Sequence, residues 1–264
     1  MLIELLNELK IRNASLYYFG LVCLLASIIF LILTRVSTTQ VFQVNAWYKP
    51  FKFAFSTFLF SWSMAWFCHY LIGFNAIYFS ISTILLLGFE IVYIAIQAGR
   101  GQLSHYNLSS PFYTAMYSMM AIAASVVTLY TAYICYLFFT SPIAPIPHYY
   151  LWAIRLSLIL FVVFSFEGFV MGSRLNHSVG GVNENSSLFI VGWSKTVGDL
   201  RVAHFVGMHA LQLLPLISFY VLKNTKSTFA VAILYGLLAV STFRQAMRGK
   251  PLIKSSIGTK MEVN

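Results

Sequence analysis

The sequence predicts an all-α integral membrane protein, a bundle of seven transmembrane helices preceded by an interfacial amphipathic helix. The first observation behind this prediction is composition. Hydrophobic residues make up 59% of the 264 residues, charged residues only 9%, and the mean hydropathy is +0.78. A soluble domain needs roughly a quarter of its residues charged to cover its surface. The second observation is that the apolar residues gather in seven runs, each long enough to cross ~30 Å of hydrocarbon at ~1.5 Å per residue.

The chain begins with a short amphipathic segment. In residues 2–12, leucine and isoleucine recur at helical spacing opposite Glu4, Glu8, Lys10 and Arg12. This pattern predicts a helix that lies in the membrane interface. The first residues are not basic and no small-residue cleavage site follows, so a secretory signal peptide is not expected.

The apolar runs define the expected domain organisation. We assign residues 1–15 to the interfacial helix, 16–247 to the seven-helix transmembrane domain and 248–264 to a basic cytoplasmic tail. Seven spans place the two termini on opposite sides of the membrane. The expected spans are residues 16–34, 53–73, 76–97, 113–139, 149–171, 202–222 and 228–247.

Basic residues set the expected orientation. Of the 17 Lys and Arg residues, twelve lie outside the spans on the side of the C-terminus, four on the side of the N-terminus, and Arg155 within the fifth span. Basic loops stay in the cytoplasm, so we expect a cytoplasmic C-terminus and a bacterial inner membrane. Topology and attraction to anionic headgroups account for the net charge of +10, and no nucleic-acid partner is expected. The expected partner is the bilayer, with a lipid or small-molecule ligand and the oligomeric state left open.

Three polar connections on the cytoplasmic side are candidates for function. They are residues 35–52, 98–112 and 172–201. Loops longer than ~12 residues without regular structure are usually functional or disordered. The three cysteines lie inside apolar runs without zinc-binding spacing, and we expect them to be packing residues.

Four stretches of the chain carry a family resemblance. They are NAWYKPFKFAFS from Asn45, FEIVYIAIQAGRGQLSHYN from Phe89, FEGFVMGSRLNHSVGG from Phe166 and VGWSKTVGDLRVAHFVGMHALQLLP from Val191. With them the chain resembles a group of bacterial polytopic membrane proteins over most of residues 45–222, and the last stretch is the most specific. The resemblance implies a multi-pass membrane fold and supplies no mechanism.

Four ionisable residues are expected at similar depth in the cytoplasmic half of the bilayer. At ~1.5 Å per residue from the predicted span ends, Glu90 lies roughly 10 Å and Glu167 roughly 7 Å below the surface. His204 and His209 lie roughly 5 and 12 Å deep. An isolated carboxylate in hydrocarbon costs roughly 2.5–3.5 kcal/mol, so both acids should face the bundle interior. We expect a polar cavity there that opens toward the cytoplasm.

Carboxylate and imidazole groups together favour a divalent metal ion such as zinc, iron or manganese. His204 and His209 are about 140° apart on a regular helix, so both bind one ion only if a π-bulge distorts it. In this interpretation Glu90, Glu167 and His209 act in catalysis on a lipid or membrane-soluble substrate. The tentative metal ligands are Glu90, Glu167, His105, His204 and His209, and the candidate substrate- or headgroup-binding residues are Arg100, Arg174, Arg201, Gln97 and Asn107.

Two other interpretations use some of the same residues. A b-type haem needs two histidines from different helices at one depth. His69 is the other histidine inside a predicted span, and it lies roughly 24 Å down, against roughly 12 Å for His209. A secondary transporter would use Glu90 and Glu167 as proton carriers. Arg155 lies near the opposite face and is expected to extend toward that interface.

Particular residues argue against two known seven-helix families. A retinal protein needs a Schiff-base lysine in its last helix, and residues 228–247 contain none. Zinc hydrolases of the ceramidase and adiponectin-receptor kind place two late histidines four residues apart, whereas His204 and His209 are five apart. Asp199 precedes the sixth span and is expected to cap that helix.

Overall fold

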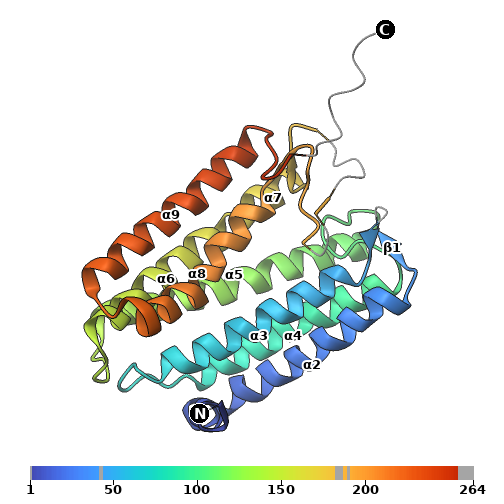
Figure 1. Cartoon of the computed structure of the whole chain (residues 1–264). Helices are drawn as coiled ribbons and strands as arrows, with labels where there is room; N and C mark the ends of the chain where they lie inside the picture. The colour runs from blue at the N-terminus through green and yellow to red at the C-terminus, as the bar shows by residue number, and fades with distance from the viewer. Residues whose placement is uncertain (1, 42–43, 182–186, 189–190, 255–264) are drawn as a thin grey trace.

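Long helices run side by side in the computed structural model, which describes residues 2–41, 44–181, 187–188 and 191–254 (Figure 1). Helix α6 continues into α7, and α8 continues into a π-helical turn, η1. The helices are α1 (Leu2–Arg12), α2 (Ala14–Val36), α3 (Tyr48–Cys68), α4 (Ile77–Gly99), α5 (Pro111–Thr140), α6 (His148–Phe166), α7 (Gly168–Arg174), α8 (Arg201–Ile217), η1 (Ser218–Leu222) and α9 (Thr225–Met247). The predicted all-helical fold is therefore confirmed.

Two small antiparallel sheets lie at one end of the bundle. Strand β1 (Gln40–Val41) pairs with β2 (Val44–Asn45) in the connection between α2 and α3. Strand β3 (Ser178–Val179) pairs with β4 (Gly198–Asp199), and Ser178 stands opposite Asp199. The second sheet joins the end of α7 to the start of α8 and so fixes the path of the long connection between them.

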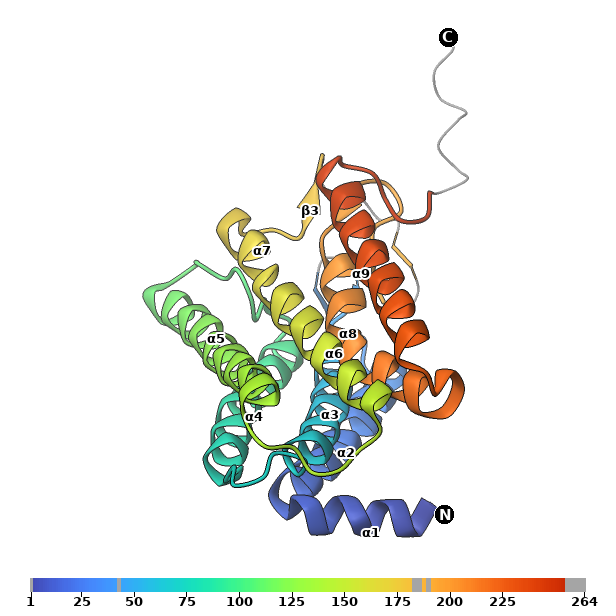
Figure 2. The same cartoon turned by 90° about the vertical axis from the view of Figure 1, so that its left-hand side faces the viewer.

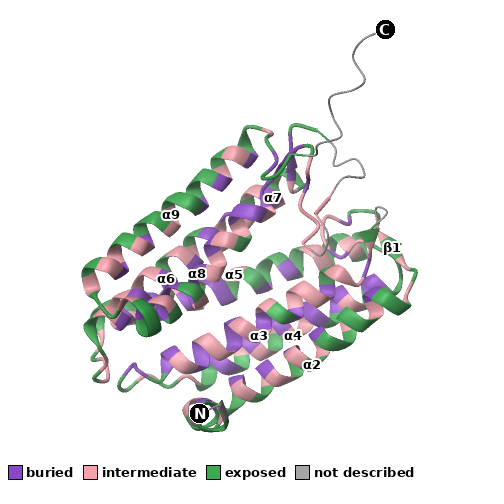
Figure 3. Ribbon diagram, viewed as in Figure 1, coloured by how far each residue is buried: buried purple, intermediate pink, exposed green. Residues whose placement is uncertain are grey.

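Six of the described helical segments are long and apolar enough to cross a membrane. They are Ala14–Val36, Ile77–Gly99, Pro111–Thr140, His148–Arg174, Arg201–Leu222 and Thr225–Met247. Their outward faces are apolar, as at Leu25, Ile29 and Ile32 of α2, which are all exposed (Figure 3). Such large apolar surfaces are stable in lipid and not in water. The chain is a multi-pass integral membrane protein.

Helix α3 begins earlier than the sequence predicts. The expected span started at residue 53, but α3 starts at Tyr48, so that Lys49 and Lys52 lie within the helix. Pro50 does not prevent this, because proline is tolerated in the first helical turn, where the amide has no intrahelical partner. Both lysines are therefore fixed to the end of a rigid element instead of a loop.

Small residues let the helices approach one another closely. A Cβ atom at Gly20 of α2 would lie 2.2 Å from the Trp62 ring of α3, and one at Gly207 of α8 would lie 1.9 Å from the Phe164 ring of α6. Small residues at crossings allow backbones to approach without a hydrophobic driving force from water. Stacked aromatic rings then connect α3 with α6, where the ring centroids of Phe60 and Phe161 are 5.2 Å apart.

Helix α1 lies crosswise over the end of the bundle where α3 finishes (Figure 2). The guanidinium of Arg12 stands over the Trp66 ring at 3.7 Å and the Tyr70 ring at 4.8 Å. Its Nε also donates to Glu8 at 2.9 Å. The side chain of Asn13 then accepts from the Leu16 amide and caps α2, which ends α1 and begins the first long helix.

Helix α8 is interrupted near its far end. Pro215 lies inside the helix, and η1 follows it directly. The distortion considered for His204 and His209 therefore lies beyond both histidines, and the segment between them is regular α-helix. On a regular helix their side chains point in different directions.

Candidate functional site

Helices α3 and α8 begin, and α4 and α7 end, at one end of the bundle (Figure 1). Because successive helices alternate in direction, these ends and the loop residues 100–110, 175–181 and 191–200 lie on one face. Every ionisable residue that the sequence nominates for a metal or an active centre lies on one of these elements. The local geometry decides which of them come together.

Asp199 and Arg201 form the best-organised polar pair of this face. Asp199 is 2% exposed, and its carboxylate accepts from Nε and Nη2 of Arg201 at 2.9 and 2.6 Å. It also accepts from the backbone amides of Ser194 and Arg201. Burial alone would raise the pKa of Asp199, but these hydrogen bonds and the Arg201 charge outweigh it and hold the pKa below its ordinary value. Asp199 is thus ionised at neutral pH.

The predicted helix-capping role of Asp199 needs correction. The residue at the N-cap of α8 is Leu200, and Asp199 lies one position earlier, in β4. The carboxylate still accepts from the first helical amide, that of Arg201 at 3.1 Å. Its main partner is the Arg201 side chain, whose Nη2 also donates to the Gly192 carbonyl. Asp199 therefore organises the loop as well as the helix start.

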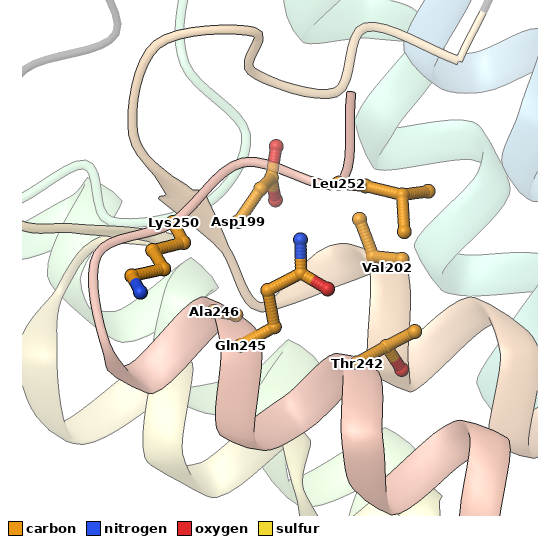
Figure 4. A pocket seen from close by; sticks show the side chains of 7 residues that line it. All are labelled: Asp199, Val202, Thr242, Gln245, Ala246, Lys250 and Leu252. Carbon is orange, nitrogen blue, oxygen red and sulfur yellow. The ribbon is translucent and has the colours of Figure 1, made fainter. Parts of the chain in front are cut away.

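A narrow crevice beside Asp199 separates the start of α8 from the end of α9 (Figure 4). Gln245 and Lys250 line it together with Asp199, and it has no room for a water molecule. The Gln245 amide donates to the Pro251 carbonyl at 2.6 Å, and Gly198 lies against the backbone of Ala246. This crevice is a packed junction that fixes β4 on α9, not a binding site.

Two lysines lie in the first turns of α3, and two histidines from the loops lie within electrostatic range of Lys49. Nζ of Lys52 donates to the Val191 carbonyl at 2.7 Å, which ties the loop before α8 to α3. Lys49 is exposed, and its charge acts on both His105 and His177. Burial lowers the pKa of His177 to about 4, with the Arg201 and Lys49 charges adding to the effect. Burial and Lys49 also lower the pKa of His105 well below its ordinary value. Both histidines are neutral at neutral pH.

Glu90 lies on the buried face of α4, where Tyr93 and Gln97 follow it at helical spacing. It is 2% exposed, and its Oε1 has no hydrogen-bond partner among the described residues. Lys49 on α3 is the cation that acts on it. A buried carboxyl group with an unfilled acceptor is costly unless a proton, water or ligand fills it.

Glu167 and His204 lie close together and form an acid–base pair. Glu167 is the residue between α6 and α7, it is 8% exposed, and neither carboxyl oxygen has a hydrogen-bond partner among the described residues. Nδ1 of His204 lies 3.5 Å from Oε2 of Glu167 and 2.7 Å from the Phe164 carbonyl. The shorter contact places a proton on Nδ1. Tyr106, from the loop after α4, lies within electrostatic range of both Glu167 and Asp199.

His209 belongs to a different network. Its Nδ1 lies 3.1 Å from Oε1 of Gln212, and Nε2 of Gln212 donates to Ser63 of α3 at 3.1 Å. The ring also contacts Phe205, with centroids 4.3 Å apart. This chain links α8 to α3 deeper in the bundle than the Glu167–His204 pair.

The structure separates the residues of the predicted metal site. Within the described part of the chain, no three His, Cys, Asp or Glu side chains stand close enough to hold one ion. Glu167 meets His204, Glu90 is acted on by Lys49, His105 bonds Ser104, and His209 bonds Gln212. For a haem, His69 follows the last residue of α3, at the opposite end of the bundle from the start of α8 that precedes His209.

The candidate substrate-binding residues have different surroundings. Arg201 is engaged by Asp199, and Asn107 is used within its own loop, where Oδ1 accepts from Ser109 at 2.7 Å. Arg100 and Arg174 are exposed at the ends of α4 and α7. Arg155 is held at the other end of the bundle, where Nε donates to the Phe138 carbonyl at 2.9 Å beside the Phe139 and Trp152 rings.

Sequence reasoning did not single out Lys49, Lys52 or His177 for the site. The three-residue separation of the two lysines, which places both on one helical face, was the available signal for them. No sequence pattern indicates a role for His177, because its position near Asp199 depends on the pairing of β3 with β4.

Comparisons of the chain with protein-family models, with curated proteins and with solved structures find no match. Membership of the bacterial polytopic group that the four stretches resemble remains a prediction.

Proposed function

We propose that this protein is a proton-coupled secondary transporter whose proton carriers are Glu90 and Glu167. The substrate enters from the cytoplasmic face, where Lys49 and Lys52 favour a small anionic compound. Two features support this function over an enzyme with a metal centre. One is that a single basic group acts on each buried acid, the Lys49 charge on Glu90 and the nearby His204 on Glu167, and the other is the dispersal of the metal-ligating residues.

In this proposal α3 is the seventh span and α1 lies in the interface. Helix α3 has 21 residues, about 32 Å at ~1.5 Å per residue, which is enough to cross the hydrocarbon. It packs beside α2 and α4, and its mean hydropathy is lowered by the lysines of its first turns. Seven spans with the basic ends inside put the C-terminus in the cytoplasm.

The observation that carries the proposal is the pair of buried carboxyl groups with unfilled hydrogen-bond acceptors. Both lie on separate spans, in the half of the bundle that the proposed orientation places toward the cytoplasm. Inside a membrane an ionised carboxylate without partners is costly, and protonation removes the charge. The charge of Lys49 acts on Glu90, and Nδ1 of His204 lies 3.5 Å from Oε2 of Glu167; both favour the ionised form of the acid when it occurs. Each acid can therefore bind and release a proton.

A polar chain leads from these acids toward the middle of the bundle. His209, Gln212 and Ser63 are connected by contacts of 3.1 Å each, across the boundary between α8 and α3. Such chains of side chains pass protons or accompany a polar substrate in membrane proteins. In this proposal the proton or substrate passes from Glu167 and His204 to His209, Gln212 and Ser63.

Flux measurements test the transporter. Protein reconstituted into vesicles that contain a pH-sensitive dye is exposed at equal pH to a panel of carboxylate and phosphate-ester metabolites. At least one compound is expected to drive a change in internal pH that is lost in Glu90→Gln and in Glu167→Gln. The control Glu4→Gln, on α1, should retain it. A proton flux that is identical in all four proteins would refute the role of the two acids.

A reporter fusion tests the topology separately. A reporter that is active only in the cytoplasm, fused after residue 254, is expected to be active, and the same reporter placed before α1 is expected to be inactive. Activity at both ends would mean an even number of spans and would remove α3 from the membrane.

A further inference from the structure

A groove opens on the outer surface of the bundle between α4 and α5. It holds about 650 Å³ and lies apart from the buried acids, since Glu90 does not line it. Its wall is apolar over most of its length, as at Leu85, Val92 and Ile96, whose side chains are all exposed. These residues face outward from a membrane-spanning helix, so hydrocarbon is the medium around them.

One end of the groove is polar. Tyr93, Gln97 and Arg100 line it where α4 ends. The Gln97 amide nitrogen donates to the Tyr93 hydroxyl at 3.3 Å and to the Leu103 carbonyl at 3.1 Å. Gln97 is 1% exposed, yet its Oε1 has no partner among the described residues. Arg100 is exposed and forms no ion pair with any described residue. Among the described residues, this end thus offers a cation without an ion pair and a buried acceptor without a hydrogen bond.

The length of the groove matches one leaflet of a bilayer. Its lining on α4 extends from Ile84 to Arg100, which are sixteen helical rises or about 24 Å apart along the helix axis. One leaflet with its headgroups is roughly 20–22 Å thick. The polar end of the groove therefore lies at headgroup level while its apolar wall lies along the acyl chains.

We infer that this groove binds one anionic glycerophospholipid. The acyl chains lie along Leu85, Val92 and Ile96, the phosphate pairs with Arg100, and a hydroxyl of the headgroup donates to Oε1 of Gln97. Free phosphate would leave the apolar wall unfilled, and a zwitterionic choline lipid carries no donor for Gln97 and no net charge for Arg100. In the proposed orientation this lipid lies in the cytoplasmic leaflet. Its binding does not depend on the proposed transport.

Native mass spectrometry of the full-length protein in detergent tests this site. The protein is stripped of lipid and titrated with phosphatidylglycerol, phosphatidylcholine or inorganic phosphate. Val92→Trp fills the groove, and Ile81→Trp is its control, because Ile81 is exposed on α4 but does not line the groove. Arg100→Gln removes the cation, and Arg248→Gln, an exposed arginine after α9, is its control.

The wild-type protein is expected to bind one phosphatidylglycerol molecule more tightly than phosphatidylcholine. It is expected not to bind inorganic phosphate. Arg100→Gln should weaken phosphatidylglycerol binding about fivefold, as expected for loss of one basic residue near the headgroup, and Val92→Trp should abolish the single tight adduct. Both controls should behave as wild type. Equal retention of the two lipids, an adduct unchanged in both groove variants, or a protein dimer in place of the lipid adduct would overturn the inference.

Discussion

Gly207→Ala should show how closely α8 must approach α6. A Cβ atom at Gly207 would lie 1.9 Å from Cγ of Phe164 and 2.3 Å from its Cβ. Packed carbon atoms lie about 3.5–4.0 Å apart, so α8 must retreat by about 1.6–2.1 Å or Phe164 must move. Overpacking of this kind costs about 1–3 kcal/mol, against a gain of about 1 kcal/mol in helix propensity. We expect a net loss of up to about 2 kcal/mol in unfolding free energy.

The same displacement reaches the acid–base pair. His204 lies one turn before Gly207, and its Nδ1 bonds the Phe164 carbonyl at 2.7 Å. Moving α8 away breaks this bond and separates His204 from Glu167, so proton-coupled flux should fall together with stability.

Reversible unfolding in mixed detergent micelles, followed by circular dichroism, measures the stability change. The matched control is Gly236→Ala on α9, where the added Cβ would stand 3.4 Å from a methyl group of Leu160, an acceptable contact. This control should be neutral or slightly more stable than wild type. If Gly207→Ala unfolds at the same detergent composition as Gly236→Ala, the close approach of α6 and α8 is wrong.

Three further perturbations address other parts of the molecule. The pKa of Asp199 is lowered in the folded protein, so its pairing with Arg201 stabilises the fold above about pH 4 and this stabilisation is lost as the pH falls further. In acid-unfolding curves, wild type should therefore be more stable than Asp199→Asn above about pH 4, and the difference in unfolding free energy should disappear below it. Arg12→Ala should cost about 0.5–1 kcal/mol through its lost contact with Trp66 and expose the α1–α2 junction to protease, unlike Asn7→Ala at an exposed position of α1. Dialysis against EDTA should leave the unfolding midpoint unchanged, because no three described ligating side chains converge; a lower midpoint would reveal a metal.

Most of the fold is predictable because lipid imposes a strict rule on the backbone. Apolar runs such as residues 76–97 form helices, here α4 (Ile77–Gly99), since every amide must be satisfied within the segment. The start of α3 was misplaced because Lys49 and Lys52 end the apolar run, while the backbone continues as a helix through them. Hydropathy indicates which residues can lie in the hydrocarbon, but it does not indicate where a helix begins.

The candidate site is only partly predictable. Depth along each span placed Glu167 and His204 at a similar level, because rise per residue is fixed, and the two side chains lie 3.5 Å apart. It gave no information on rotation about the helix axis, and so it grouped Glu90 and His209 with residues that they do not contact. The Lys49 and His177 surroundings depend on the loop before α8, whose path no local pattern specifies.

The most direct test of the account is whether Glu90 and Glu167 change protonation inside the bundle. Infrared difference spectra of the reconstituted protein, recorded while the pH is lowered from about 10 to 4, detect the C=O stretch of each newly protonated carboxyl group. We expect one such band to vanish in Glu90→Gln and another in Glu167→Gln, with both retained in Glu4→Gln. Spectra in which neither substitution removes a band would contradict the account.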